Sequence, residues 1–219
     1  MTVVTIERKV LEKNDEIAQA NRALFARHKL FVFNIVSSPG AGKTTLLERT
    51  IEALNAEVKI AVVEGDVQTD FDAQRVARYG VPAVQIVTNG GCHLEARLVR
   101  DAVETMDLAA TDLLVIENVG NLVCPANYDL GEALKVVVLS TTEGEDKPLK
   151  YPAMFKRASV LIVNKIDLLP YVNARVEKIE QYARDINPDL TIFRTSCTTG
   201  DGIAAWCDWL RQRVAAARA

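Results

Sequence analysis

The chain has 219 residues, of which 49% are hydrophobic and 25% charged, a composition typical of a globular protein with one full core. Its net charge of −3 provides no general basic field for nucleic acid, and no apolar run approaches the roughly 20 residues needed to cross a bilayer. Residues 1–13 are too charged for a signal peptide and the four cysteines are widely spaced, so we expect a cytoplasmic protein that binds neither nucleic acid nor membrane.

Apolar patterning predicts that helices and strands alternate along the chain. Residues 7–28 carry apolar side chains at a rough helical period, which predicts an amphipathic N-terminal helix. Short β-branched and apolar runs that end in polar or glycine-rich turns predict strands at 30–36, 58–63, 83–87, 113–116, 135–139, 159–163 and 191–193. The stretches between and after these runs predict helices at 46–54, 71–79, 94–104, 149–157, 172–186 and 203–214.

This alternation favours an α/β fold with a mostly parallel sheet that is covered by helices on both faces. The sequence contains no evident repeat and no linker that would divide the sheet between two domains. We therefore expect an N-terminal helix within residues 1–29 and a single globular domain over residues 30–219.

A glycine-rich loop joins the first predicted strand to the helix that follows it. This loop matches the phosphate-binding P-loop pattern, except that Ser37 stands at the position of its first glycine. Glycines allow consecutive backbone N–H groups to converge on a phosphate, and the helix N-terminus adds partial positive charge. The predicted phosphate contacts are Ser38, Pro39, Gly40, Ala41, Gly42, Lys43, Thr44 and Thr45.

Two residues of the loop have specific predicted roles. Lys43 would reach the β- and γ-phosphates, and the Thr44 hydroxyl would ligate Mg²⁺. The alternative is a glycine-rich turn that binds nothing. The Lys-Thr-Thr sequence at a strand-to-helix junction favours a P-loop NTPase.

A second motif predicts which base is bound. The sequence Asn164-Lys165-Ile166-Asp167 ends a predicted strand, where open α/β sheets hold their ligands. A carboxylate at Asp167 can accept from N1–H and the exocyclic amine of guanine, whereas adenine offers no such pair of donors. Asn164 would brace the loop, and the Lys165 side chain would cover the base. Ser196 and Cys197 follow the next predicted strand, where a loop that contacts guanine O6 is expected. The nucleotide is therefore predicted to be GTP.

Magnesium requires oxygen ligands beside the phosphates. Thr44 is one, and the carboxylates of Asp66, just after the second predicted strand, and Glu117, at the end of the strand predicted at 113–116, are the other candidates. Gly120 would sense the γ-phosphate in the segment 117–120. With Lys43, both carboxylates form the predicted catalytic set, and Asp66 is the first candidate for activating water. The alternative for Asp66 is a helix N-cap.

Two cysteines and a histidine form a candidate site for a softer metal. Cys92 and His93 lie on a glycine-rich loop, and Cys124 follows the segment 117–120. Thiolates and imidazole suit Zn²⁺ or Ni²⁺. Three ligands leave the site open or shared across a two-fold axis. The thiols of Cys197 and Cys207 are expected to be structural.

On these motifs the chain resembles the HypB family of hydrogenase (and sometimes urease) nickel-incorporation GTPases, within the SIMIBI class of P-loop GTPases. The matching stretches span nearly the whole chain, and residues 117–125 with Cys92 and His93 are the most specific. They are residues 38–44, 64–67, 92–94, 117–125, 141–148 and 164–167.

The resemblance implies a slow GTPase that forms a homodimer when GTP is bound, with Zn²⁺ or Ni²⁺ held at the dimer interface by Cys92, His93 and Cys124. It also implies a HypA-like nickel chaperone as partner and the large subunit of a [NiFe] hydrogenase as recipient. Some members begin with a Cys-rich or His-rich nickel segment. Residues 1–30 hold no cysteine and only His28, so nickel is expected at the domain site alone.

Three alternatives remain open at this point. One is a G protein without metal cargo that regulates another enzyme, as related cobalamin-mutase chaperones do. Another is a UreG-like urease chaperone, although the expected Cys-Pro-His motif is absent. A motor or membrane-targeting ATPase is the third, and the guanine motif at 164–167 argues against it.

Overall fold

The computed structural model describes residues 6–69 and 71–219. Over this part of the chain, parallel strands form one seven-stranded sheet in the order β3-β2-β4-β1-β5-β6-β7. The strands are β1 (Phe31–Ser37), β2 (Ile60–Asp66), β3 (Ala83–Val87), β4 (Leu113–Glu117), β5 (Leu134–Ser140), β6 (Val160–Asn164) and β7 (Thr191–Arg194). The predicted α/β fold with a parallel sheet is confirmed.

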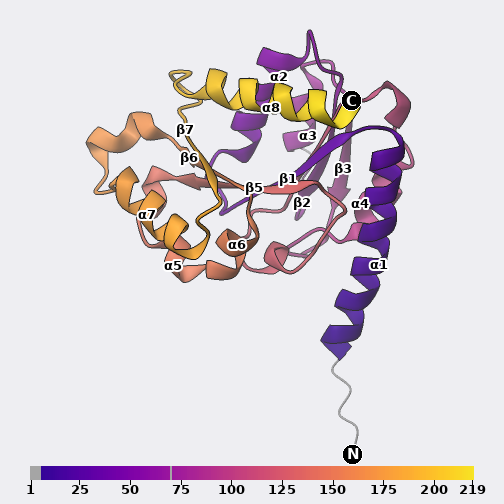
Figure 1. Cartoon of the computed structure of the whole chain (residues 1–219), viewed down its shortest axis with the longest axis horizontal. Helices are drawn as coiled ribbons and strands as arrows, with labels where there is room; N and C mark the ends of the chain where they lie inside the picture. Colours follow the sequence, from indigo (N-terminus) through magenta and orange to yellow (C-terminus); the bar gives the residue numbers. More distant parts are fainter. Residues whose placement is uncertain (1–5, 70) are drawn as a thin grey trace, which may run out of the picture.

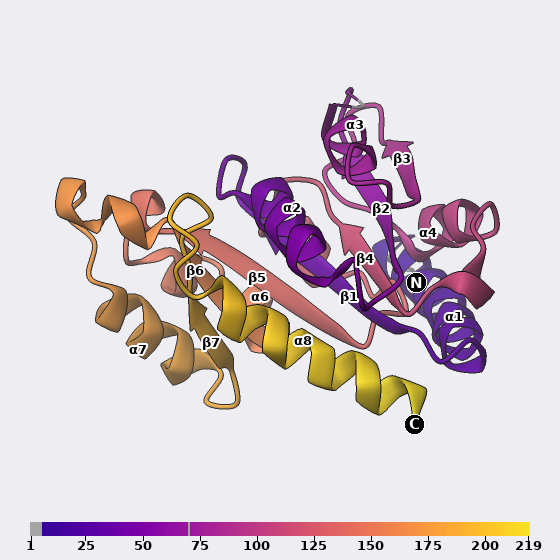
Figure 2. The same ribbon diagram turned by 90° about the horizontal axis from the view of Figure 1, so that it is seen from above.

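Helices cover both faces of the sheet (Figures 1 and 2). The helices are α1 (Ile6–Arg27), α2 (Lys43–Leu54), α3 (Phe71–Ala77), α4 (Ala96–Val103), α5 (Lys147–Lys150), α6 (Pro152–Arg157), α7 (Val176–Ile186) and α8 (Ile203–Arg218). Helices α2, α3 and α8 pack on one face, whereas α6 and α7 cover one part of the other face and α1 and α4 its remainder. Burial on both faces explains why the central strands are continuous apolar runs.

Trp206 of α8 anchors the face that α2 and α8 cover. Its fully buried ring meets Phe33 and Phe193 edge to face, with centroids 5.8 and 5.6 Å apart. Its indole N–H donates to the Thr50 hydroxyl at 3.0 Å, which satisfies the one polar atom of the ring. Cys207 is also buried here, as predicted for a structural thiol, and burial raises its pKa to about 11.

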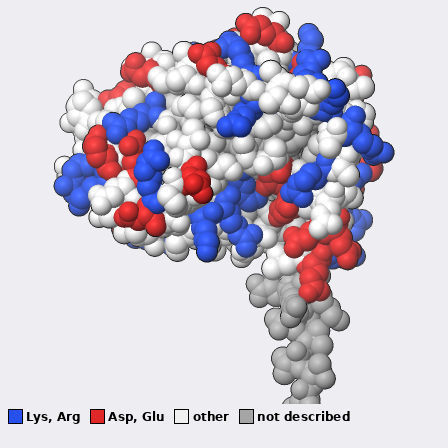
Figure 3. All heavy atoms as spheres, viewed as in Figure 1, with Lys and Arg blue, Asp and Glu red and all other residues white. Residues whose placement is uncertain are grey.

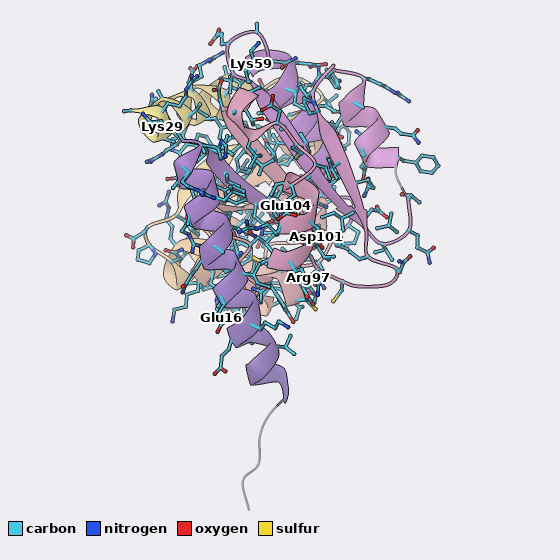
Figure 4. The ribbon with its side chains drawn as sticks, turned by 90° about the vertical axis from the view of Figure 1, so that its right-hand side faces the viewer. Glu16, Lys29, Lys59, Arg97, Asp101 and Glu104 are labelled. Carbon is cyan, nitrogen blue, oxygen red and sulfur yellow. The ribbon has the colours of Figure 1, made fainter. Side chains whose placement is uncertain are left out.

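Buried asparagines hold α1 against the sheet domain. Asn14 donates to the Asp129 carbonyl and accepts from the Ala96 N–H, both at 2.8 Å, and Asn21 donates to the carbonyls of Ala96 and Leu130. Figure 4 shows α1 beside α4, with Lys29 close to the end of α8, where its Nζ donates to a backbone carbonyl at 3.0 Å. The expected boundary at residue 29 stays a prediction.

Several element boundaries differ from the sequence predictions for identifiable reasons. The helix predicted at 149–157 is two short helices, because Pro152 has no N–H to continue the first and favours the start of the second. Helix α7 begins at Val176, after a 3₁₀ segment at Ile166–Tyr171 that contains Pro170. Helix α4 begins at Ala96, so Cys92 and His93 lie in the loop before it.

Charge is mixed on the face drawn in Figure 3, where basic and acidic side chains are interspersed around an uncharged central area. Within residues 6–69 and 71–219, no helix is both long and apolar enough to cross a bilayer.

The glycine that begins α8 provides a test of the fold. Gly202 has φ of +72°, and a Cβ there would overlap the carbonyl oxygen of Arg194. We expect Gly202→Ala to lower the free energy of unfolding by about 3 kcal/mol, because strain adds to a backbone clash. The control is Gly200→Ala, where φ is +87° but nothing lies within 4 Å, so only about 1–2 kcal/mol is expected. Urea denaturation measures both, and equal losses would contradict the packing described here.

Candidate nucleotide and metal site

The carboxyl ends of β1, β2, β4 and β6 meet at one edge of the sheet, as parallel strands require. The P-loop lies there, between β1 and α2, and borders a cleft of about 480 Å³. Nine of the residues predicted to bind nucleotide or magnesium line this cleft. Its walls are Pro39, Gly40, Gly42, Lys43, Thr44, Thr45, Asp66, Val67, Asp72, Arg75, Val119, Gly120 and Lys165.

The serine at the first P-loop glycine position contacts the P-loop lysine. Ser37 is fully buried, and its Oγ accepts from Lys43 Nζ at 3.2 Å. The same Nζ lies 3.9 Å from Glu117 Oε1. The Thr44 hydroxyl donates to Glu117 Oε1 at 2.7 Å. Lys43, Thr44 and Glu117, which are predicted to bind phosphate or magnesium, therefore contact one another through Glu117.

A second carboxylate, Glu64, lies next to Glu117. The two residues are paired in the register of β2 and β4, and both are at most 3% exposed. Burial raises the pKa of Glu117 to about 7, and burial together with the nearby Glu117 charge raises that of Glu64 to about 10. Among the described residues, Glu64 Oε1 and Glu117 Oε2 find no hydrogen-bond partner. Buried carboxylate oxygens without partners fit a cation such as Mg²⁺.

Asp66 ends β2 at the rim of the cleft. Its Oδ1 accepts from the backbone N–H groups of Gln68 and Thr69 at 2.8 and 3.0 Å, which fixes the carboxylate at the turn. Burial alone would raise its pKa, but these backbone hydrogen bonds outweigh burial and lower it. Asp66 is therefore ionised and positioned beside the phosphate loop, a geometry that suits the predicted role.

Two cleft residues, Asp72 and Arg75 of α3, were not predicted from the sequence. The Arg75 guanidinium contacts Glu48 at 2.6 Å, Asp72 at 3.2 Å and the Thr45 hydroxyl at 3.2 Å. In the sequence, an aspartate and an arginine three residues apart on a helix indicate only an ordinary surface ion pair.

The predicted guanine residues form a cluster beside the cleft. Asn164 Nδ2 donates to the Ala41 carbonyl of the P-loop at 3.0 Å, and its Oδ1 accepts from Cys197 at 3.5 Å. The Ser196 hydroxyl donates to Asp167 at 2.5 Å. Asn164 therefore braces the loop as predicted from the sequence. Lys165 of this motif lines the phosphate cleft, and the other members of the cluster adjoin it.

Lys165 and Ser38 extend these contacts. Lys165 has a left-handed backbone, with φ of +62°, and its Nζ donates to the Gly40 carbonyl at 2.7 Å. The Ser38 hydroxyl accepts from Lys147 Nζ at 3.3 Å. Ala41 is fully buried, and its carbonyl oxygen is the acceptor of the Asn164 hydrogen bond.

The three candidate soft-metal ligands lie together. One ligand atom from each of Cys92, His93 and Cys124 lies within 4.8 Å of the others, and the two sulfur atoms are 2.8 Å apart. The hydrogen bond to Cys124 and then burial raise the pKa of Cys92, whereas burial lowers that of His93, so the imidazole is neutral. The Tyr128 ring lies against the His93 ring, with centroids 3.9 Å apart and planes tilted by 35°, a support that the sequence did not indicate.

Comparison with known proteins identifies the family of this chain. The CobW/HypB/UreG nucleotide-binding domain matches residues 31–194. A hydrogenase maturation factor HypB from Azotobacter chroococcum is 55% identical over 99% of this chain and 72% of its own length.

Two crystal structures are also similar. HypB from Archaeoglobus fulgidus has a TM-score of 0.87 and 40% identity, covering 93% of this chain and 99% of that one. HypB from Helicobacter pylori in complex with nickel has a TM-score of 0.88 and 40% identity, covering 92% and 95%. The chain therefore belongs to the CobW/HypB/UreG family and, within it, to the HypB hydrogenase maturation factors, which are GTPases.

Proposed function

We propose that the chain is a GTP-switched nickel metallochaperone that carries Ni²⁺ on Cys92, His93 and Cys124 for insertion into a [NiFe] hydrogenase. The observation that carries this proposal is the meeting of these three ligand atoms within 4.8 Å, beside the segment that lines the nucleotide cleft. A relative from Helicobacter pylori crystallised in complex with nickel supports it. Zn²⁺ suits the same ligands.

Three ligands leave one tetrahedral position open, which suits a cargo that must be received and released. We propose that a homodimer forms when GTP is bound and brings the two sites together at its interface. Val123, beside Cys124, is 59% exposed and offers an apolar contact for that interface. A HypA-like nickel chaperone and the hydrogenase large subunit are the proposed partners on either side of the transfer.

Magnesium would be held by Thr44, Asp66 and Glu117, and when bound it would neutralise charge on the β- and γ-phosphates. Lys43 would donate to the same phosphates, and Gly120 would place its backbone near the γ-phosphate. Asp66 is the proposed group that orients the attacking water, because its carboxylate is ionised and fixed at the rim of the cleft.

The nickel ligands can be tested by spectroscopy. Titration of the purified chain with Ni²⁺ is expected to produce a thiolate-to-nickel charge-transfer band that saturates with the bound metal, because Cys92 and Cys124 must deprotonate to bind. Nickel binding without a thiolate band would place the ligands elsewhere and contradict the proposal.

Base selection provides a second prediction. Asp167→Asn is expected to weaken GTP binding by about 10- to 100-fold, because an amide cannot accept from both guanine donors. Binding of xanthosine triphosphate should strengthen, since its C2 carbonyl accepts from the new amide. Competition binding with GTP, ATP and xanthosine triphosphate measures both effects. Asp201→Asn, in the exposed loop nearby, is the control, and an equal loss there would contradict the guanine assignment.

A further inference from the structure

Two asparagines in the segment after β4 contact the loop that carries Cys92 and His93. Asn118 is 1% exposed, and its Oδ1 accepts from the backbone N–H of Leu94 at 3.1 Å. Asn121 is half-buried, and its Nδ2 donates to the carbonyl oxygen of Cys92 at 3.2 Å. The backbone on both sides of His93 is therefore tied to this segment.

The same segment forms a wall of the nucleotide cleft. Asn118 follows Glu117 directly, and its Oδ1 also accepts from the N–H of Val119 at 3.0 Å. Val119 and Gly120 line the cleft. A Cβ on Gly120 would lie 3.1–3.2 Å from atoms of Pro39, so the segment rests on the P-loop. A phosphate that moves Gly120 would therefore also move Val119, whose N–H is hydrogen-bonded to the Asn118 side chain.

A buried network fixes the orientation of Asn118. Its Nδ2 donates to Asn34 Oδ1 at 3.3 Å, and Asn34 Nδ2 donates to Glu132 Oε1 at 3.4 Å. Glu132 in turn forms a buried ion pair with Lys135. Because both Oδ1 and Nδ2 of the Asn118 side chain are hydrogen-bonded, the side chain cannot turn freely when the segment moves.

Leu94 has little freedom to absorb such a movement. Its side chain is fully buried, and a Cβ on Gly65 of β2 would lie within 2.8–2.9 Å of Leu94 carbons. A close-packed contact transmits displacement instead of yielding to it. A shift at Asn118 is therefore passed to the backbone that carries His93.

We infer that Asn118 and Asn121 are positioning residues that transmit the nucleotide state of the cleft to the Cys92–His93–Cys124 cluster. They would thereby set the difference in nickel affinity between the GDP and GTP states. This inference rests on the proposed function, because it requires nickel at the cluster and GTP in the cleft.

The test measures nickel affinity by chelator competition in the full chain, loaded with GDP or with a non-hydrolysable GTP analogue. In the unaltered chain we expect the two affinities to differ by about 5-fold or more, the usual range of allosteric coupling. In Asn121→Ala and Asn118→Ala the ratio should fall below about 2-fold, while the thiolate-to-nickel band and analogue binding persist. By reciprocity, nickel should change the ratio of analogue affinity to GDP affinity by the same factor in the unaltered chain and lose this effect in both variants.

Asn187→Ala is the matched control. Asn187 follows α7, and its Nδ2 donates to the carbonyls of Phe155 and Ala158; these residues neither line the nucleotide cleft nor belong to the metal cluster. This variant should keep the full ratio. If Asn118→Ala does not fold, Asn121→Ala decides, since that side chain is half-buried and its loss removes two hydrogen bonds, the one to the Cys92 carbonyl and the one from the Val123 N–H.

The outcomes separate the two proposals. An unaltered ratio in Asn121→Ala or in folded Asn118→Ala would overturn the inference and leave the nickel function standing. A ratio of one in the unaltered chain would also overturn the inference. Absence of the thiolate band in the unaltered chain would overturn both.

Discussion

Replacing Cys92 and Cys124 together by Ala is expected to lower nickel affinity by at least about 100-fold. Loss of a group that only supports a metal ligand costs 10- to 100-fold, so loss of two ligands should cost more. The remaining His93 imidazole offers a single nitrogen, which cannot hold the ion by itself against a chelator. The measurement is nickel affinity by competition with a chelator of known affinity.

Cys207→Ala is the matched control for this double substitution. Its thiol is 1% exposed in α8, packed with Trp206, and burial raises its pKa, so it is an inert core group. The variant should lose some stability and keep nickel affinity within a factor of about 2. Unchanged nickel binding in the double variant would contradict the assignment of the cluster.

Lys43→Ala is expected to lower the rate of GTP hydrolysis by about 10²–10³-fold, the usual cost of one preorganised donor to developing charge. The Lys43 ammonium lies between Ser37 and the buried Glu117, so it is positioned before nucleotide binds. Its loss also removes one of the two cations, Lys43 and Arg75, whose charges lower the pKa values of Glu64 and Glu117. Phosphate release at saturating GTP measures the rate.

Lys59→Ala controls for the loss of a positive charge. Lys59 is exposed at the opposite end of β2 from Asp66, before the strand begins (Figure 4). Its removal should leave the hydrolysis rate within a factor of about 2, because an exposed charge far from the cleft is screened. Comparable losses in both variants would show that net charge, and not the P-loop contact, governs the rate.

Most of the fold could be predicted from the sequence, because a doubly covered parallel sheet leaves a strong local pattern. Each strand is short, apolar and followed by a turn, so all seven were found within a few residues. Helix ends were predicted less well. The start of α7 depends on the 3₁₀ segment around Pro170, and the division of α5 from α6 depends on Pro152, whose effects on helix bounds are local and hard to rank in advance.

The site could be predicted where one motif carries the chemistry. The P-loop and the residues Asn164, Asp167 and Ser196 lie close together as expected, since strand ends bring them to one edge. Glu64 was missed because its role depends on the pairing of β2 with β4, which places it beside Glu117. Sequence spacing carries no information on which strands are neighbours.

The supports of the metal cluster were missed for a similar reason. Tyr128 packs against His93 from a loop far along the chain, and Asn118 contacts Leu94 across 24 positions. An asparagine or tyrosine in a loop is an ordinary residue until the tertiary structure supplies its partner. The roles assigned to the site residues stay predictions, whereas family and fold are confirmed.

The most direct test of the central claim is nickel and zinc content per chain, measured together with solution mass after loading with GDP or a non-hydrolysable GTP analogue. The proposed switch predicts a dimer with the analogue and a change in bound metal that Cys92→Ala abolishes. Equal mass and equal metal content in both nucleotide states would contradict the switch and favour a GTPase that regulates another enzyme without metal cargo.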